Sequence, residues 1–182
     1  MSVKRKRREK MTGTSHKSTR EIAYLGLFVS LSMILSYLES LIPVYLGAPG
    51  IKPGLANLFV LLLLMKKRVR EAVIVNLLRI ILSGFLFGNL FSIVYSIAGA
   101  ALSMTVMYGM IFGVRLHPVM ASVAGGIAHN LAQLAVALLI LDTNAMLYYL
   151  PVLVLAGGIS GVFNGVLAEF LKPYLRGVWE HS

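Results

Sequence analysis

Residues 49–57 read Pro49-Gly-Ile-Lys-Pro-Gly-Leu-Ala-Asn57, and an unbroken apolar run from Leu58 to Met65 follows directly. Proline fixes φ and removes a backbone donor, whereas glycine frees φ, so this backbone turns sharply and does not continue a helix. Such backbone is tolerated near a bilayer only at its surface, or where it is buried in protein or lines a water-filled cavity. We therefore expect a binding loop here, with the rest of the chain forming a helical cup around it.

The composition is typical of an integral membrane protein. The 182 residues are 58% hydrophobic and 13% charged, and the mean hydropathy is +0.81, whereas a soluble domain is nearer half apolar and a quarter charged. The lack of cysteine excludes disulfides, thiolate catalysis and cysteine-metal sites. The net charge of +10 does not indicate a nucleic-acid partner, because the cations cluster at the ends of apolar segments, next to the lipid bilayer.

The apolar pattern predicts an all-α membrane protein in three parts: a disordered basic arm over residues 1–20, a six-helix membrane domain over 21–172 and a cytoplasmic tail over 173–182. The first apolar run, from Ile22 to Pro43, is longer than the apolar region of a signal peptide and matches the roughly 20 residues that a membrane span needs. We therefore interpret it as an uncleaved helix. The six expected helices cover about residues 22–43, 54–65, 71–88, 90–113, 119–141 and 146–171.

The charge distribution predicts the orientation. Six helices place both termini on one side, and this side would carry 15 of the 17 cations: eight in the arm, four after the second helix, one after the fourth and two in the tail. Of the other two cations, Lys52 lies on the opposite face and Arg79 lies within the third helix. We expect a multi-pass protein of the plasma membrane with the basic face and both termini in the cytoplasm.

Arg79 is the one cation expected inside the membrane. It follows Glu71 by eight residues, so at about 1.5 Å per residue it lies about 12 Å deep. A membrane arginine costs at least about 2.5 kcal/mol and usually faces a cavity or a partner. Two interpretations stay open. Arg79 binds an anionic group such as a carboxylate or diphosphate, or it pairs with an acid such as Glu39 or snorkels to a surface.

Other polar residues lie within the apolar segments. His129 and Gln133 share one face of a helix, with Asn130 beside them. This trio is either a hydrogen-bonding surface for a ligand or a set of interhelical contacts; one histidine with two amides lacks the ligands of a metal site. Four further side chains could bind a ligand or pack between helices: Asn57, Asn76, Asn89 and Asn164.

Small residues predict close helix contacts. Gly157, Gly161 and Gly165 recur every four residues, a small-xxx-small pattern that lets two helices approach closely, by default within the fold. Gly26 and Ser30 form another small pair near the cytoplasmic end of the first helix. A helix of a partner protein could dock there.

Several blocks of sequence, taken in order, carry a family resemblance. They are Pro49-Gly-Ile-Lys-Pro-Gly-Leu-Ala-Asn57, Asn76-Leu-Leu-Arg79, Phe87-Gly-Asn-Leu-Phe-Ser92, Ser96-Ile-Ala-Gly-Ala-Ala-Leu-Ser103, Gly126-Ile-Ala-His-Asn-Leu-Ala-Gln133 and Tyr149-Leu-Pro-Val-Leu153. Over about residues 20–172 this set resembles the Gx transporter family, also labelled heptaprenyl diphosphate synthase component I. That family is similar to the substrate-binding S components of energy-coupling factor (ECF) transporters, which are six-helix proteins with outer loops that cap a small ligand.

The resemblance implies a first hypothesis for the function. The chain would be an S component that captures a small anionic or isoprenoid-related precursor, with a membrane T component and two cytoplasmic ATPases as partners. The T component would meet the first helix around Gly26 and Ser30. The pocket would be lined by Lys52, Asn57, Arg79, Asn89, His129, Asn130, Gln133 and Asn164.

The second hypothesis is a non-catalytic membrane subunit, component I, of a heptaprenyl diphosphate synthase. Chain-elongating prenyl synthases resemble one another in two aspartate-rich motifs that hold Mg²⁺ through carboxylate oxygens. This chain has a single aspartate, Asp142, and six dispersed glutamates. It also lacks the G-x-x-x-x-G-K-[ST] phosphate-binding loop. We therefore expect no catalytic residues, no cofactor and no metal site, with the energy or the chemistry supplied by a partner.

Overall fold

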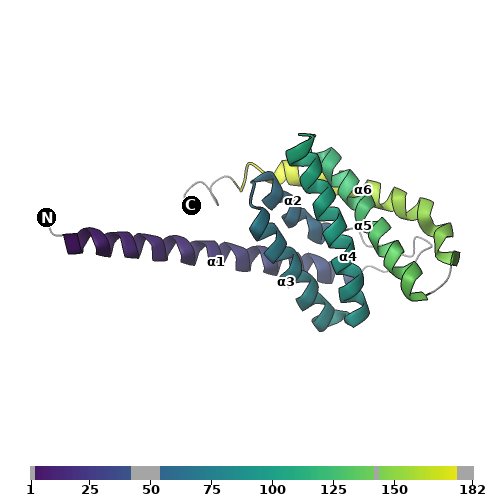
Figure 1. Ribbon diagram of the computed structural model, residues 1–182, viewed down its shortest axis with the longest axis horizontal. Helices are drawn as coiled ribbons and strands as arrows, with labels where there is room; N and C mark the ends of the chain where they lie inside the picture. The colour runs from purple at the N-terminus through teal and green to yellow at the C-terminus, as the bar shows by residue number, and fades with distance from the viewer. Residues whose placement is uncertain (1–2, 42–53, 142–143, 176–182) are drawn as a thin grey trace.

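The computed structural model describes residues 3–41, 54–141 and 144–175, and this part of the chain consists of helices joined by short turns. Six α-helices and three short helical segments follow one another along the chain (Figure 1). The α-helices are α1 (Val3–Leu41), α2 (Leu58–Met65), α3 (Val69–Phe87), α4 (Leu90–Tyr108), α5 (Pro118–Leu141) and α6 (Leu150–Leu171). The short segments are η1 (Leu55–Asn57), the π-helical η2 (Gly109–Gly113) and η3 (Asn144–Tyr149).

Four helical stretches are long and apolar enough to cross a membrane: Thr19–Leu41, Leu90–Gly113, Pro118–Ile140 and Ala145–Leu171. The other two helices differ for physical reasons. α2 has only eight residues, about 12 Å at 1.5 Å per residue, and α3 carries three charged side chains, Arg70, Glu71 and Arg79. The prediction of six helices is confirmed, and a membrane location is supported by four of them. The six membrane crossings and the cytoplasmic termini stay predictions.

The helix boundaries follow local signals in the sequence. Asn89 and Ser92 form a capping box at the start of α4, in which each side chain bonds the other's backbone N–H. Pro118 begins α5, where a missing N–H is tolerated. α1 begins at Val3, inside the arm that we expected to be disordered. Lys52 and the other residues from 49 to 53 of the expected binding loop lie outside the described residues.

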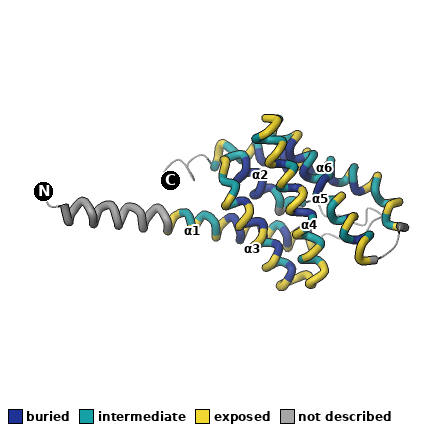
Figure 2. Tube along the Cα trace, viewed as in Figure 1, coloured by how far each residue is buried: buried dark blue, intermediate teal, exposed yellow. Residues whose placement is uncertain are grey.

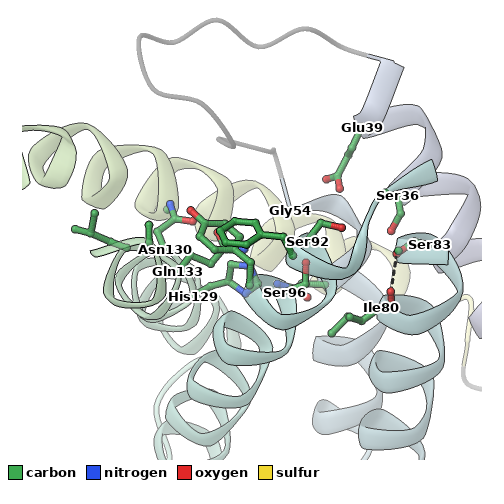
Figure 3. A pocket seen from close by; sticks show the side chains of 18 of the residues that line it. Ser36, Glu39, Gly54, Ile80, Ser83, Ser92, Ser96, His129, Asn130 and Gln133 are labelled. Atoms are coloured by element: carbon green, nitrogen blue, oxygen red, sulfur yellow. Dashed lines mark hydrogen bonds between the residues drawn. The ribbon is translucent and has the colours of Figure 1, made fainter. Parts of the chain in front are cut away.

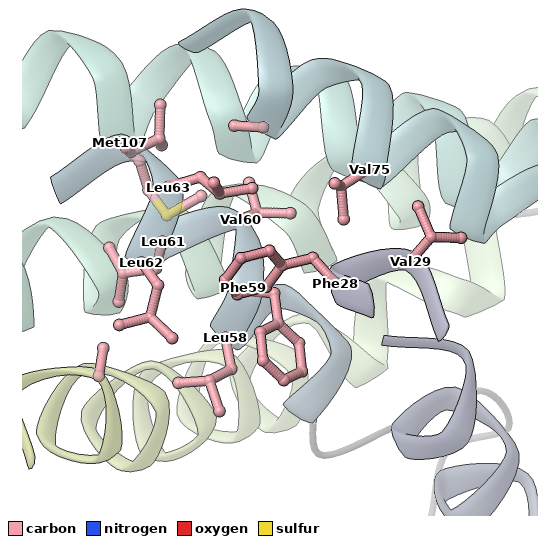
Figure 4. Close-up of a cluster of buried hydrophobic side chains, with 13 residues drawn as sticks. Phe28, Val29, Leu58, Phe59, Val60, Leu61, Leu62, Leu63, Val75 and Met107 are labelled. Atoms are coloured by element: carbon pink, nitrogen blue, oxygen red, sulfur yellow. The ribbon is translucent and has the colours of Figure 1, made fainter. Parts of the chain in front are cut away.

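α2 lies at the centre of the molecule. Every residue from Leu58 to Leu64 is buried, and Figure 4 shows this run among side chains such as Phe28, Val75 and Met107 from the surrounding helices. A helix that is apolar all round is a core helix, not a surface one. Between helices in a membrane, close packing and not removal from water provides the attraction, so α2 holds the surrounding helices together through its packing contacts. Most of the exposed positions lie on the outer faces of the other helices (Figure 2).

α5 and α6 pack with their backbones in close contact. A Cβ atom at Gly126 would lie 2.3 Å from the carbonyl oxygen of Gly157, and one at Gly161 would lie 2.5 Å from the Cα of Val123. Gly165 makes a similar approach to Val119. The repeat of glycines every four residues therefore packs within the fold, as the sequence predicted.

Candidate functional site

A cavity of about 420 Å³ lies between α1, η1 and α3 on one side and α4, α5, η3 and α6 on the other. This volume is within the range of roughly 300–1,000 Å³ that holds small ligands. Figure 3 shows side chains from both sides converging on it, with Ser36, Glu39 and Ser83 opposite His129, Asn130 and Gln133. The apolar part of the lining includes Ile80, Phe87, Phe91, Leu134, Ala137, Met146 and Leu153.

The cavity brings together six of the eight side chains that the sequence nominated for a substrate pocket. They come from η1, α3, the start of α4, and α5: Asn57, Arg79, Asn89, His129, Asn130 and Gln133. Lys52 lies outside the described residues. Asn164 is buried on α6 and is not among the lining residues.

Arg79 is held in place by two asparagine side chains. Its Nη2 donates to Asn76 Oδ1 at 2.7 Å and to Asn57 Oδ1 at 3.4 Å, and its buried Nε has no hydrogen-bond partner among the described residues. Glu39, which is buried on α1, attracts Arg79 electrostatically. The structure thus supports part of both interpretations, because Arg79 faces the cavity and is also influenced by an acid.

The segment that enters α2 is tied to three helices. Glu39 Oε1 on α1 accepts a hydrogen bond from Leu55 N, and Asn57 accepts one from Arg79 on α3. Asn164 Nδ2 on α6 donates to the carbonyl oxygen of Gly54 at 2.9 Å. Gly54 has φ of 72°, a left-handed conformation that glycine adopts at no steric cost. Asn164 therefore anchors the wall of the cavity from outside its lining.

The polar trio of α5 faces the cavity but does not act as one unit. Asn130 Nδ2 donates to the carbonyl oxygen of Leu153 at 2.7 Å and so joins α5 to α6. The imidazole ring of His129 packs against Gly99 on α4, while its buried Nδ1 has no partner among the described residues. Gln133 lines the cavity beside it. A Cβ atom at Gly99 would lie 2.8 Å from the imidazole ring of His129, so a larger residue there would displace this ring.

Asn89 lies at the edge of the cavity and has a structural task as well. Its Oδ1 accepts a hydrogen bond of 2.7 Å from Ser92 N, and its own N–H donates to Ser92 Oγ at 3.1 Å. Asn89 thus fixes the start of α4, where the chain turns back from α3. Its role in ligand binding stays a prediction.

The sequence did not identify several lining residues. Glu39 was considered only as a partner of Arg79. Ser92 and Ser96 were not singled out for the pocket, although their spacing of four puts them on one helix face, close in sequence to Asn89. Nothing in the sequence distinguishes Tyr95 and Tyr149, which line the cavity, from aromatic side chains that face the membrane. The further polar groups are Ser36, Ser83 and Ser160.

Gly26 and Ser30 lie apart from the cavity on an exposed part of α1. Ser30 Oγ donates to the carbonyl oxygen of Gly26 at 2.8 Å, and a Cβ atom at Gly26 would meet no atom within 4 Å. Docking of a partner helix at this pair stays a prediction.

A family model described as heptaprenyl diphosphate synthase component I matches residues 28–171 of the chain. The matched region contains all the lining residues of the cavity. No curated protein and no solved structure matches the chain.

Proposed function

We propose that this chain, which belongs to the heptaprenyl diphosphate synthase component I family, is a non-catalytic membrane component that binds a small molecule in the Arg79 cavity. The family name favours this hypothesis over that of an uptake component. By that name, the chain would work with a second, catalytic synthase component. The single aspartate of the sequence supports a division of labour, because a diphosphate-binding Mg²⁺ site needs several carboxylates.

The observation that carries the binding part of the proposal is the position of Arg79. A guanidinium inside an apolar helical bundle is costly, and here it is held by Asn76 and Asn57 at the wall of a cavity of ligand size. A component that served only as a scaffold would not need this arrangement. We infer that a small polar molecule binds there and that its presence regulates or supplies the partner.

Capture of a small molecule for uptake is the second candidate, and the cavity is the observation that favours it. Polar groups from α1, η1, α3, α4 and α5 line one cavity, as a substrate-binding S component of an ECF transporter would require. In that case the exposed pair of Gly26 and Ser30 would meet a T component, and two cytoplasmic ATPases would supply the energy. The membrane would be the plasma membrane, with both termini in the cytoplasm.

Affinity purification of the tagged full-length chain from its native membrane in mild detergent, followed by mass spectrometry of proteins, tests the two candidates against each other. Recovery of a prenyl diphosphate synthase subunit without ATPases would support the first. Recovery of a T component with two ATPases would overturn the first and support the second. A matched purification of an unrelated tagged membrane protein identifies background binders.

A further inference from the structure

The lining of the cavity changes from polar to apolar along α3. Arg79, Ser83 and Phe87 line it at intervals of four residues, so they lie on one face of the helix. At 1.5 Å per residue, Phe87 lies about 12 Å farther along the helix axis than Arg79. It is the last residue of α3, at the turn into α4. On this wall, a cationic group therefore lies at one end of the cavity and an aromatic ring lies at the other.

The opposite wall shows the same order. Only residues 114–117 join η2 to α5, and such short connections make neighbouring helices antiparallel, so α5 runs toward the end at which α3 stops. On α5, the polar trio comes before Leu134 and Ala137. The lining residues of η3 and α6, which start from this end, follow in the reverse order, from apolar to small and polar: Tyr149, Leu153, Gly157 and Ser160.

The polar end of the cavity, around Arg79 and the polar trio, contains a group that only donates hydrogen bonds. Arg79 bonds the described residues through Nη2, and its buried Nε has no partner among them. A guanidinium has no acceptor, and a buried donor without a partner is costly. A ligand group that lies at Arg79 therefore has to accept hydrogen bonds, as the oxygen atoms of a carboxylate, a phosphate or an amide do.

The apolar end of the cavity, around Phe87, reaches the outer surface of the protein. Phe87 and Phe91 line the cavity and are still 37% and 44% exposed, and the ring of Phe91 stacks on that of Tyr95 with 6.0 Å between the centroids. Two polar residues also lie here, but Asn89 Oδ1 and Ser92 Oγ both bond within the cap of α4. The walls that α3 to α6 form at this end thus offer mainly apolar and aromatic surface to a ligand.

The size of the cavity limits the length of a ligand. At roughly 30 Å³ for each water-sized group, a volume of about 420 Å³ holds on the order of 14 such groups. A head group of a few non-hydrogen atoms then leaves room for a chain of about eight to ten carbons. The seven isoprene units of a heptaprenyl diphosphate need far more room.

We propose that the cavity binds a small amphiphile, with a hydrogen-bond-accepting head group at Arg79 and a single apolar chain along the apolar end toward Phe87 and Phe91. This inference rests on the proposed function of the cavity as a small-molecule site and names its ligand class. The order of polar and apolar residues on both walls carries it, because a molecule that is polar throughout would leave the apolar end without a matching surface.

Calorimetry on the full chain in lipid nanodiscs, corrected for binding to empty nanodiscs, tests the chain. The probes are straight-chain carboxylic acids of 4 to 16 carbons and octanedioic acid, with affinities expressed per free aqueous concentration. We expect the affinity to rise about fourfold for each added CH₂ group up to about eight to ten carbons, from burial of the chain, and no further beyond. Octanedioic acid should bind at least about 10-fold more weakly than octanoic acid, because its far end is polar.

The head group is tested with octyl phosphate, octanamide and octylamine in the same assay. Tighter binding of any acceptor head than of octylamine, whose ammonium group only donates, supports the proposal and identifies the head. Octylamine at least as tight as every acceptor head would overturn the ligand class. Equal binding of octanoic and octanedioic acids would also overturn it, while leaving the cavity a small-molecule site. Failure of every amphiphile to bind would overturn it as well.

A substitution at the apolar end provides a sharper test. Met146 lines the cavity in η3, and Met146→Ala removes three non-hydrogen atoms there. We expect the preferred acid to become about two to three carbons longer, because the chain fills the space left behind. Met120→Ala, at an exposed position of α5 outside the lining, should leave the preferred length unchanged. An unchanged preferred length in Met146→Ala would contradict the placement of the chain. The chain-length series on the parent chain tests the proposal independently of this variant.

Discussion

Asn164 on α6 donates a 2.9 Å hydrogen bond to the carbonyl oxygen of Gly54, 110 positions earlier in the chain. In the same short segment, Leu55 N donates to Glu39 of α1, and Asn57 Oδ1 accepts a hydrogen bond from Arg79 of α3. Three helices that are distant in sequence thus meet at the entrance to α2. The polar wall of the cavity and the apolar core of α2 share this junction.

Substitution Asn164→Ala should destabilise the junction. The carbonyl of Gly54 loses its donor in a buried position, which costs about 1–3 kcal/mol, or about 0.6–2 kcal/mol by measurements within membranes. Thermal unfolding in detergent measures the effect, with Val162→Ala on the exposed face of the same helix as control. An equal melting temperature for Asn164→Ala and the parent chain would show that the bond contributes nothing.

Gly161→Ala and Gly158→Ala form a matched pair on α6. A Cβ atom at Gly161 would lie 2.5 Å from the backbone of α5, whereas one at Gly158 would meet nothing within 4 Å. We expect Gly161→Ala to be destabilising by more than about 2 kcal/mol, because backbone cannot move aside. Gly158→Ala should be neutral or stabilising by up to about 1 kcal/mol, from helix propensity. Similar unfolding temperatures for the two variants would contradict the close packing of α5 and α6.

The hydrogen bond between Asn76 and Arg79 should couple the effects that substitutions at these two residues have on the free energy of unfolding. Asn76 is buried and accepts the shortest hydrogen bond of the arginine, so Asn76→Ala and Arg79→Ala should be non-additive. A double-mutant cycle on the free energy of unfolding should give a coupling of about 1–3 kcal/mol. Additive effects would mean that Asn76 does not position Arg79.

The orientation can be tested with single cysteines, because the chain has none of its own. Arg70→Cys lies at an exposed position of α3 on the expected cytoplasmic face, and Tyr148→Cys lies at an 87% exposed position before α6 on the opposite face. A membrane-impermeant maleimide added to intact cells should label Tyr148→Cys and should label Arg70→Cys only after permeabilisation. The reverse pattern would contradict the orientation that the charge distribution predicts.

The sequence predicts the helices of this protein well because apolar runs and their charged ends decide them. Five of the six expected ranges differ from the structural bounds by only a few residues, and the close packing at Gly157 and Gly161 follows from their spacing. The role of α2 was not predictable in this way. Its eight apolar residues could be read as a shortened span, and only the packing of the surrounding helices shows that it is a core.

Part of the lining of the candidate cavity could also be predicted from residue type. Charged and amide side chains such as Arg79 and Gln133 stand out in apolar helices. Their burial is energetically costly, so they usually have a binding partner or a function. Whether such a residue faces a cavity or a neighbouring helix depends on tertiary contacts. Asn164, which the sequence nominated for the pocket, therefore lies outside the lining and bonds the backbone of Gly54, which lies in it. Hydroxyl groups such as Ser83 carry little cost in a helix and gave no signal.

Native mass spectrometry of the full chain, extracted from its own membrane, tests the central claim that the Arg79 cavity binds a small molecule. We predict a bound small-molecule mass on the parent chain and on the control Arg70→Gln, which removes an exposed cation from the same helix. On Arg79→Gln, the occupancy of the bound molecule should be about 10- to 100-fold lower. Equal occupancy on the parent chain and Arg79→Gln, or no bound molecule on either, would contradict the account.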